Sequence, residues 1–143
     1  AVEIGVEKIS FIICDRSERK YLEINRMERI AIAALKQSSG TYLPEIQLST
    51  FNEFLNNVSH NISNTCRMIA WCENMEETPL ISQNNLEQEE IILLIGPEGD
   101  FTFKEVEMAK DKGFQEVRLG NKILRTETAA IYGTIAISMI KTK

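Results

Sequence analysis

Three long apolar runs along the chain predict buried β-strands. They are KISFIIC at residues 8–14, CRMIAWC at residues 66–72 and IILLI at residues 91–95. Their positions are apolar almost throughout instead of at every second residue, which is typical of strands covered on both faces of a sheet. A shorter strand, EVRLG, is predicted at residues 116–120.

Helical segments alternate with these strands. Thr50 and Thr102 each precede a glutamate by three residues, which is the spacing of a capping box at a helix start. Asn25 and Thr126 are the predicted N-caps of two further helices, and Pro44 predicts an extended connection. The predicted helices cover residues 26–38, 51–58, 103–112 and 126–141. The first has a predicted apolar face made of Met27, Ile30, Ile32, Ala34 and Leu35.

This alternation of helices with apolar strands predicts one α/β domain over residues 1–143, with a mostly parallel sheet covered on both faces. The sequence starts with AVEIGVEKI, which has the pattern of a last helical turn, a glycine cap at Gly5 and then a strand. We therefore expect a further segment upstream of Ala1.

Composition narrows the functional classes. A net charge of -5 argues against binding nucleic acid by charge alone, because such domains carry a basic face, yet it leaves room for an enzyme that contacts nucleic acid locally. The three cysteines form no C-x-x-C pair, and His60 lies in a polar stretch, so we expect reduced thiols, a solvated histidine and no metal. The longest apolar stretch, residues 129–140, is too short for a membrane span, and no secretory signal is visible. We expect a cytoplasmic protein with no membrane partner.

The stretch IGPEGDFTFKE at residues 95–105 follows a predicted strand, and ligands of open α/β sheets bind at the carboxyl ends of strands. The stretch matches neither the phosphate loop G-x-x-x-x-G-K-[ST] nor the dinucleotide fingerprint G-x-G-x-x-G, and Glu98 would repel a phosphate. A ligand with a neutral ring or a positive centre fits better, although a plain tight turn also explains the sequence GPEG. Two other predicted strand ends carry informative sequence, at residues 71–73 and 119–125.

Arg125 stands directly before the last predicted helix, in NKILRTETAA. A cation at a helix N-terminus opposes the helix dipole, whereas Glu127 in the first turn suits it. Two explanations for Arg125 stay open: a structural ion pair with Glu98 or Glu127, or a role toward a ligand.

The segment IGPEGDFTFKEVEMAKDKGFQEVRLGNKILRTETAA resembles the C-terminal signature of the RsmE family, which comprises SPOUT-superfamily RNA methyltransferases acting on a uridine of 16S small-subunit ribosomal RNA. Upstream, EIGVEKI and AALKQSSGTYLPEI are similar to family segments, so the resemblance spans nearly the whole chain. It implies a SPOUT-type α/β knot with a deep trefoil knot at the C-terminal end. It also implies a homodimer with the knots at its interface, and S-adenosyl-L-methionine as the methyl donor.

By this resemblance, the donor pocket is formed by the knot loops. The implied cofactor-binding residues are Ile95, Gly96, Glu98, Gly99, Leu119, Gly120, Ile123, Leu124, Arg125 and Thr128. Arg125 is the implied catalytic cation, because charge moves onto the ring oxygens as uridine N3 loses its proton, and Glu127 is a weaker candidate for the general base. Gln37 and Ser38 are candidate substrate contacts, with an ordinary helix end as the equal alternative.

The chain also departs from the family pattern. Asp100 stands where the family commonly has a second glycine, which we expect to be tolerated if Asp100 keeps a negative φ angle. The family's N-terminal PUA-like RNA-binding domain is missing, which would account for the negative charge and implies weak or no RNA methylation by residues 1–143 alone. Two alternatives stay open: a SPOUT methyltransferase with another RNA target, and a non-catalytic dimeric ligand-binding module.

Overall fold

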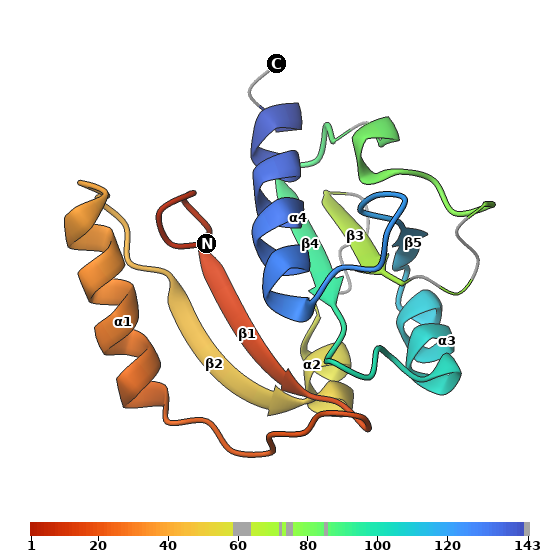
Figure 1. Ribbon diagram of the computed structural model, residues 1–143, viewed down its shortest axis with the longest axis horizontal. Helices are drawn as coiled ribbons and strands as arrows, with labels where there is room; N and C mark the ends of the chain where they lie inside the picture. The colour runs from red at the N-terminus through yellow and green to blue at the C-terminus, as the bar shows by residue number, and fades with distance from the viewer. Residues whose placement is uncertain (59–63, 72, 74–75, 85, 142–143) are drawn as a thin grey trace.

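Two parallel sheets organise the chain, instead of the single sheet that the sequence predicts (Figure 1). The computed structural model describes residues 1–58, 64–71, 73, 76–84 and 86–141. In the first sheet, β1 (Lys8–Ile13) pairs in parallel with β2 (Glu45–Thr50). In the second, β3 (Thr65–Ala70) lies between β4 (Glu90–Ile95) and β5 (Gln115–Val117), again all parallel. The mixed α/β class with parallel strands is confirmed, and the single sheet is wrong.

Strand β2 is the element that the apolar pattern does not predict. Its sequence EIQLST has two aliphatic residues and follows Pro44, so the pattern indicates only an extended connection. The strand forms because its backbone pairs with β1 over the whole length, from Lys8 opposite Glu45 to Ile13 opposite Thr50. Its extended conformation was therefore predicted and its pairing was not.

In the described part of the chain, four helices connect and cover the strands. They are α1 (Ile24–Gln37), α2 (Phe51–Asn57), α3 (Phe103–Asp111) and α4 (Thr126–Lys141), and a single 3-10 turn covers Ile81–Gln83. Both predicted capping boxes are present: the Thr50 and Thr102 hydroxyls accept the backbone N–H of Glu53 and Glu105, whose carboxylates accept the N–H groups of the two threonines.

The predicted start and apolar face of α1 need correction. Glu23, not Asn25, is the capping position, because the Glu23 carbonyl already accepts the backbone N–H groups of Arg26 and Met27. Ala31 is the buried residue of this helix, whereas Ile30 and Ile32 are exposed. Figure 1 shows why: α1 stands at the outer side of the β1–β2 sheet, so that much of its circumference faces solvent.

The core consists of two apolar clusters. One surrounds Phe51 and Phe101, whose rings lie 5.7 Å apart, and it includes Leu94 of β4. The first sheet contributes to it through Ile12 of β1, which packs against the cluster. The other lies between the β3–β4–β5 sheet and α4. Here Gly133 permits close packing, because a Cβ at this position would lie 2.5 Å from Leu93 Cδ2.

The predictions for His60 and Cys72 fall on residues outside the described part of the chain. Cys14 and Cys66 are free thiols. None of the described helices is long and apolar enough to cross a membrane. The described residues also contain no group of three or more His, Cys, Asp or Glu side chains placed to hold a metal ion.

The thiol of Cys14 should be unreactive in the folded protein. Burial, and secondarily the nearby Glu105 carboxylate, raise the pKa of Cys14 from 9.0 to about 12. At pH 8 the reactive thiolate is then roughly a thousandfold scarcer than in an ordinary thiol. We expect iodoacetamide to label Cys14 far more slowly in buffer than in denaturing urea, as measured by mass spectrometry of the peptide.

The raised pKa of Cys14 also makes the stability of the folded protein depend on pH. The folded state keeps the Cys14 proton up to a higher pH than the unfolded state, so the contribution to stability is complete below pH 9 and is lost as pH rises toward about 12. Equal labelling rates at pH 8 in the folded and unfolded protein would contradict the raised pKa.

Candidate functional site

The carboxyl ends of three strands meet at one edge of the second sheet. Ala70, the last residue of β3, pairs with Ile95 of β4 on one side and with Val117 of β5 on the other. The backbone N–H of Trp71 then donates to the Val117 carbonyl at 3.3 Å. The three strand ends that the sequence singles out as informative therefore lie side by side, and the segments following β4 and β5 start on either side of β3.

The turn after β4 contains a left-handed residue at a position where glycine is common. The Asp100 N–H donates to the Pro97 carbonyl at 2.9 Å, and Asp100 has φ +59°. The negative φ on which the tolerance of an aspartate was expected to depend is therefore not present, and another reason must explain the residue. Aspartate is among the non-glycine residues that tolerate this conformation, because its short side chain bonds to nearby backbone. Here Asp100 Oδ1 accepts the N–H of Phe101 at 2.8 Å.

Gly96 has no side chain because Asp100 occupies the adjacent space. A Cβ on Gly96 would lie 2.7 Å from Asp100 Oδ1 and 3.3 Å from both Asp100 Cα and the Phe101 nitrogen. The space on the Cβ side of Gly96 is therefore taken by the turn itself, so that Gly96 makes the turn compact.

A hydrogen bond joins this turn to the start of α4. The Thr126 hydroxyl donates to the Gly96 carbonyl at 2.9 Å. Thr126 is therefore not the side-chain N-cap that the sequence predicts: the helix begins at Thr126 itself, and Arg125 precedes it, with its carbonyl accepting the N–H of Ala129 at 2.8 Å. The bond brings Arg125 next to the turn from which Glu98 projects.

Three exposed charges flank this hydrogen bond: Glu98, Arg125 and Glu127. Among the described residues, the guanidinium of Arg125 makes no ion pair or hydrogen bond, so a structural ion pair with Glu98 or Glu127 has no support. Thr128 is exposed on the same first turn of α4. Such a set of groups can stabilise a positive centre with a carboxylate and a developing negative charge with a guanidinium.

The segment from Arg118 to Arg125 is anchored at both ends and open in the middle. At the first end the Arg118 N–H donates to the Pro79 carbonyl at 2.9 Å, and its side-chain Nε donates to the Thr78 carbonyl at 2.8 Å. Leu119 is buried, and Leu124 packs against the same cluster. Between them, a Cβ on Gly120 would touch nothing within 4 Å, and Ile123 is 80% exposed. The middle of the segment can therefore contact a ligand or a partner.

The candidate substrate residues Gln37 and Ser38 lie elsewhere in the chain. They end α1 at the side of the molecule away from the β4 carboxyl end and the start of α4 (Figure 1). The Ser38 hydroxyl donates to the Ala34 carbonyl at 2.9 Å, which fits the helix-end interpretation. Within one chain, the structure does not bring these two residues to the other site residues.

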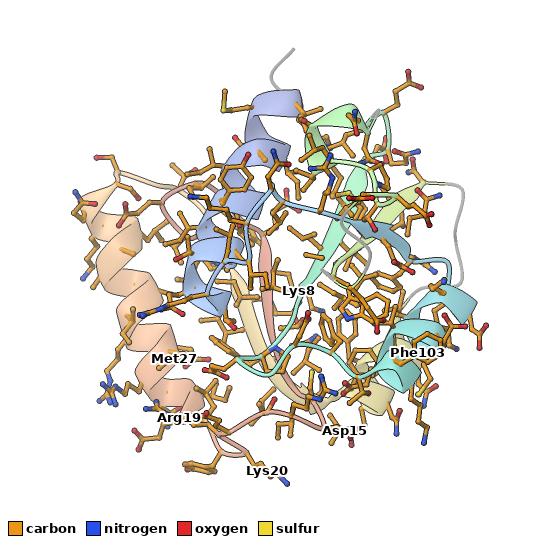
Figure 2. All side chains as sticks on the ribbon, turned by 45° about the vertical axis from the view of Figure 1, so that its right-hand side comes forward. Lys8, Asp15, Arg19, Lys20, Met27 and Phe103 are labelled. Atoms are coloured by element: carbon orange, nitrogen blue, oxygen red, sulfur yellow. The ribbon has the colours of Figure 1, made fainter. Side chains whose placement is uncertain are left out.

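Asp15 and Arg16, which follow β1, also contact the turn after β4 and the start of α3, and the sequence did not predict these contacts. The Asp15 N–H donates to Glu105 Oε1 at 2.9 Å, and Arg16 Nη1 donates to the Gly99 carbonyl at 2.9 Å and to the Phe101 carbonyl at 3.4 Å. Figure 2 shows Asp15, Arg19 and Lys20 along the same lower edge of the molecule. A signal was available, because KISFIIC is a predicted strand and the rule about carboxyl ends applies to it as well.

A cavity of about 460 Å³ opens beside this edge. It lies at the carboxyl ends of β1 and β2 and is lined in part by Asp15, Lys20, Thr50, Lys104 and Glu105. None of the residues predicted to bind the cofactor lines it. It therefore adjoins the predicted site without being part of it.

The parallel α/β fold and the clustered strand ends indicate an α/β domain that binds a ligand at the carboxyl ends of its strands. Comparison with known proteins identifies its family. Residues 1–138 match the family model described as RNA methyltransferase domain. The chain belongs to this family of RNA methyltransferase domains.

Individual relatives agree with this assignment. Ribosomal RNA small subunit methyltransferase E 2 of Borreliella burgdorferi is 36% identical over 138 residues, which cover 92% of this chain and 54% of the relative. The crystal structure of a probable rRNA-methyltransferase from Porphyromonas gingivalis has a TM-score of 0.87 at 36% identity, covering 99% of this chain and 59% of that one. The crystal structure of ribosomal RNA small subunit methyltransferase E from Neisseria gonorrhoeae bound to S-adenosyl methionine has a TM-score of 0.83 at 29% identity. The match covers 99% of this chain and 56% of that one. The chain spans about half the length of the curated relatives it matches.

The left-handed conformation of Asp100 gives a test by substitution. Asp100→Ala keeps the strain of a Cβ at positive φ and loses the acceptor for the Phe101 N–H, whereas Asp100→Gly loses the acceptor but also removes the strain. The strain is worth about 1 kcal/mol. We therefore expect the alanine variant to be less stable than the glycine variant by about 1 kcal/mol or more in urea unfolding. Equal stability of the two variants would show that φ is not positive in solution.

Proposed function

We propose that this chain is the catalytic domain of an S-adenosyl-L-methionine-dependent methyltransferase that methylates N3 of a uridine in 16S ribosomal RNA. The family membership and the names of the relatives support the reaction class and the ribosomal substrate. The N. gonorrhoeae relative bound to S-adenosyl methionine supports the donor. The observation that carries the proposal is the Thr126–Gly96 hydrogen bond, because Arg125, which has no partner among the described residues, lies beside the turn that would hold the donor.

The residues at the strand ends fit a donor of this kind. The donor supplies a methyl group on a positively charged sulfonium, and Glu98 and Glu127 offer carboxylates that no described residue neutralises. Gly120 has open space on its Cβ side, and Ile123 presents an exposed aliphatic surface for an adenine ring. Ile95, Gly96, Gly99, Leu119, Leu124 and Thr128 complete the proposed donor site, the buried Leu119 through its backbone.

The acceptor step explains the placement of Arg125. N3 of uridine must lose its proton before or during methyl transfer, and the resulting charge spreads onto the two ring oxygens. A guanidinium near these oxygens stabilises that charge. Glu127, two residues further along the chain, is the weaker candidate for the base that takes the proton, and a carboxylate of a partner subunit is the alternative.

The proposed assembly is a homodimer built on α4. The outward side of this helix exposes Ile131, Tyr132, Ile135 and Met139, and three of these recur at intervals of four residues along one helix face. An exposed apolar stripe of this kind marks an interaction surface. We further propose that the C-terminal end of the chain forms a deep trefoil knot, that the protein is cytoplasmic, and that RNA binding depends on a domain outside this chain.

Donor binding tests the proposal against a non-catalytic module. We expect the 143-residue chain to bind S-adenosyl-L-methionine with a 1:1 stoichiometry per chain in isothermal titration calorimetry. S-adenosyl-L-homocysteine, which lacks the positive sulfonium, should bind more weakly if Glu98 and Glu127 face that centre. A well-folded dimer that binds neither compound would contradict the proposal and favour the ligand-binding module.

Arg125→Ala tests the catalytic assignment in the complete protein. Turnover on small-subunit ribosomal RNA should fall roughly 100-fold, the usual effect of removing one group that stabilises a developing negative charge. The Kd for S-adenosyl-L-methionine should change by less than about threefold, because the ring oxygens of the acceptor are the proposed target. Lys122→Ala is the matched control, since it removes a cation from the same segment. Unchanged turnover in Arg125→Ala would refute the assignment.

A further inference from the structure

The segment after β1 is fastened to the turn after β4 by an arginine. Arg16 Nη1 donates to the Gly99 carbonyl at 2.9 Å and to the Phe101 carbonyl at 3.4 Å, although the residues lie more than 80 positions apart in the sequence. Residues 96–101, here called the donor turn, are therefore held from outside their own sheet, because Arg16 follows a strand of the other sheet.

The stem of Arg16 also lies directly on the donor turn. A Cβ on Gly99 would approach Arg16 Cβ to 3.1 Å, Cδ to 3.3 Å and Cγ to 3.7 Å. Gly99 is not one of the described glycines with a positive φ, so its backbone conformation does not demand glycine. The close approach of Arg16 explains the absence of a side chain at this position.

The segment that carries Arg16 is itself held in place. The Cys14 N–H donates to Ser17 Oγ at 3.0 Å, which closes a short loop around Arg16. The Asp15 N–H donates to Glu105, which is 4% exposed and also accepts the N–H of Thr102 at the start of α3. The Arg16 side chain is exposed, but it starts from a backbone segment that these hydrogen bonds hold on both sides, and its guanidinium bonds to the turn.

We propose that Arg16 is a positioning residue for the methyl donor. It holds the Gly99 side of the donor turn, while Thr126 holds the Gly96 side, so the turn is clamped between the two sheets and α4. This inference rests on the proposed function, since it assigns the donor to that turn. Arg16 need not touch the donor: it sets the backbone against which the donor binds.

The chemistry requires arginine at this position. The guanidinium is planar and presents several N–H donors in a fixed arrangement, so one side chain can serve two carbonyls. Lysine carries a compact charge on a flexible stem and keeps only part of this geometry. A role in positioning therefore predicts partial rescue by Arg16→Lys, whereas a merely electrostatic role predicts complete rescue.

The experiment compares donor affinity in variants of the 143-residue chain by isothermal titration calorimetry. Arg16→Ala should raise the Kd for S-adenosyl-L-methionine about tenfold, and Arg16→Lys by a smaller factor. Arg19→Ala is the matched control, because it removes an exposed arginine from the same segment, and it should leave the Kd within twofold. Thr50→Ala removes the capping box of α2 and controls for a general loss of stability, so its Tm should fall while the Kd stays unchanged.

A double-mutant cycle separates positioning from folding. Gly99→Ala pushes the turn and Arg16 apart and should weaken donor binding by itself, whereas the combination with Arg16→Ala should be no worse than the stronger single variant. In the complete protein, Arg16→Ala should raise KM for the donor about tenfold and lower kcat less than threefold. If Arg16→Ala does not fold, Arg16→Lys and Gly99→Ala carry the same comparison.

The outcomes distinguish this inference from the proposed function. A wild-type chain that binds the donor, together with an Arg16→Ala variant that binds it within twofold, overturns the positioning role alone. Additive effects in the cycle also overturn it, because two residues that act through one contact must be coupled. A folded wild-type chain that binds no donor overturns the proposed function, and this inference with it.

Discussion

The hydrogen bond from the Thr126 hydroxyl to the Gly96 carbonyl is the contact on which the site depends. It joins the first residue of α4 to the first residue after β4, which lie 30 positions apart in the sequence. Because Arg125 and Glu127 flank Thr126, and Glu98 follows Gly96 closely, one neutral bond fixes the two backbone segments that carry three charges. The charges themselves form no ion pair within the described part of the chain, so the arrangement is set by uncharged backbone and hydroxyl groups.

The two glycines of GPEG are explained by protein atoms on their Cβ sides. Gly96 faces the Asp100 carboxylate, and Gly99 faces the stem of Arg16. Both therefore serve the compactness of the donor turn, and the donor would meet the turn through its backbone and through Glu98. The same turn tolerates an aspartate at positive φ because the side chain bonds to the next N–H. Local strain and local hydrogen bonding thus occur in the same few residues.

The elements that depend on neighbouring residues were predictable, and the pairings between distant segments were not. Both capping boxes, the last helix and the strands at β1, β3 and β4 follow from patterns of a few residues. Strand β2 was missed because its stability comes from pairing with β1, and the division into two sheets has no local signal. The hydrogen bond from Arg16 to the Gly99 carbonyl joins residues 83 positions apart, so no spacing rule indicates it. The positive φ of Asp100 was not predicted either, because the turn geometry determines it.

Gly133 has a consequence for the outer surface of α4. Its missing side chain lets the helix rest on Leu93 so closely that turning the helix about its axis would drive a bulkier residue into β4. The rotation of α4 is therefore locked from the inside. Ile131, Ile135 and Met139 are exposed on this helix, so the backbone positions that carry them are set by its inner packing. A molecule that binds this face meets a surface already in its final orientation, and loses little entropy in ordering it.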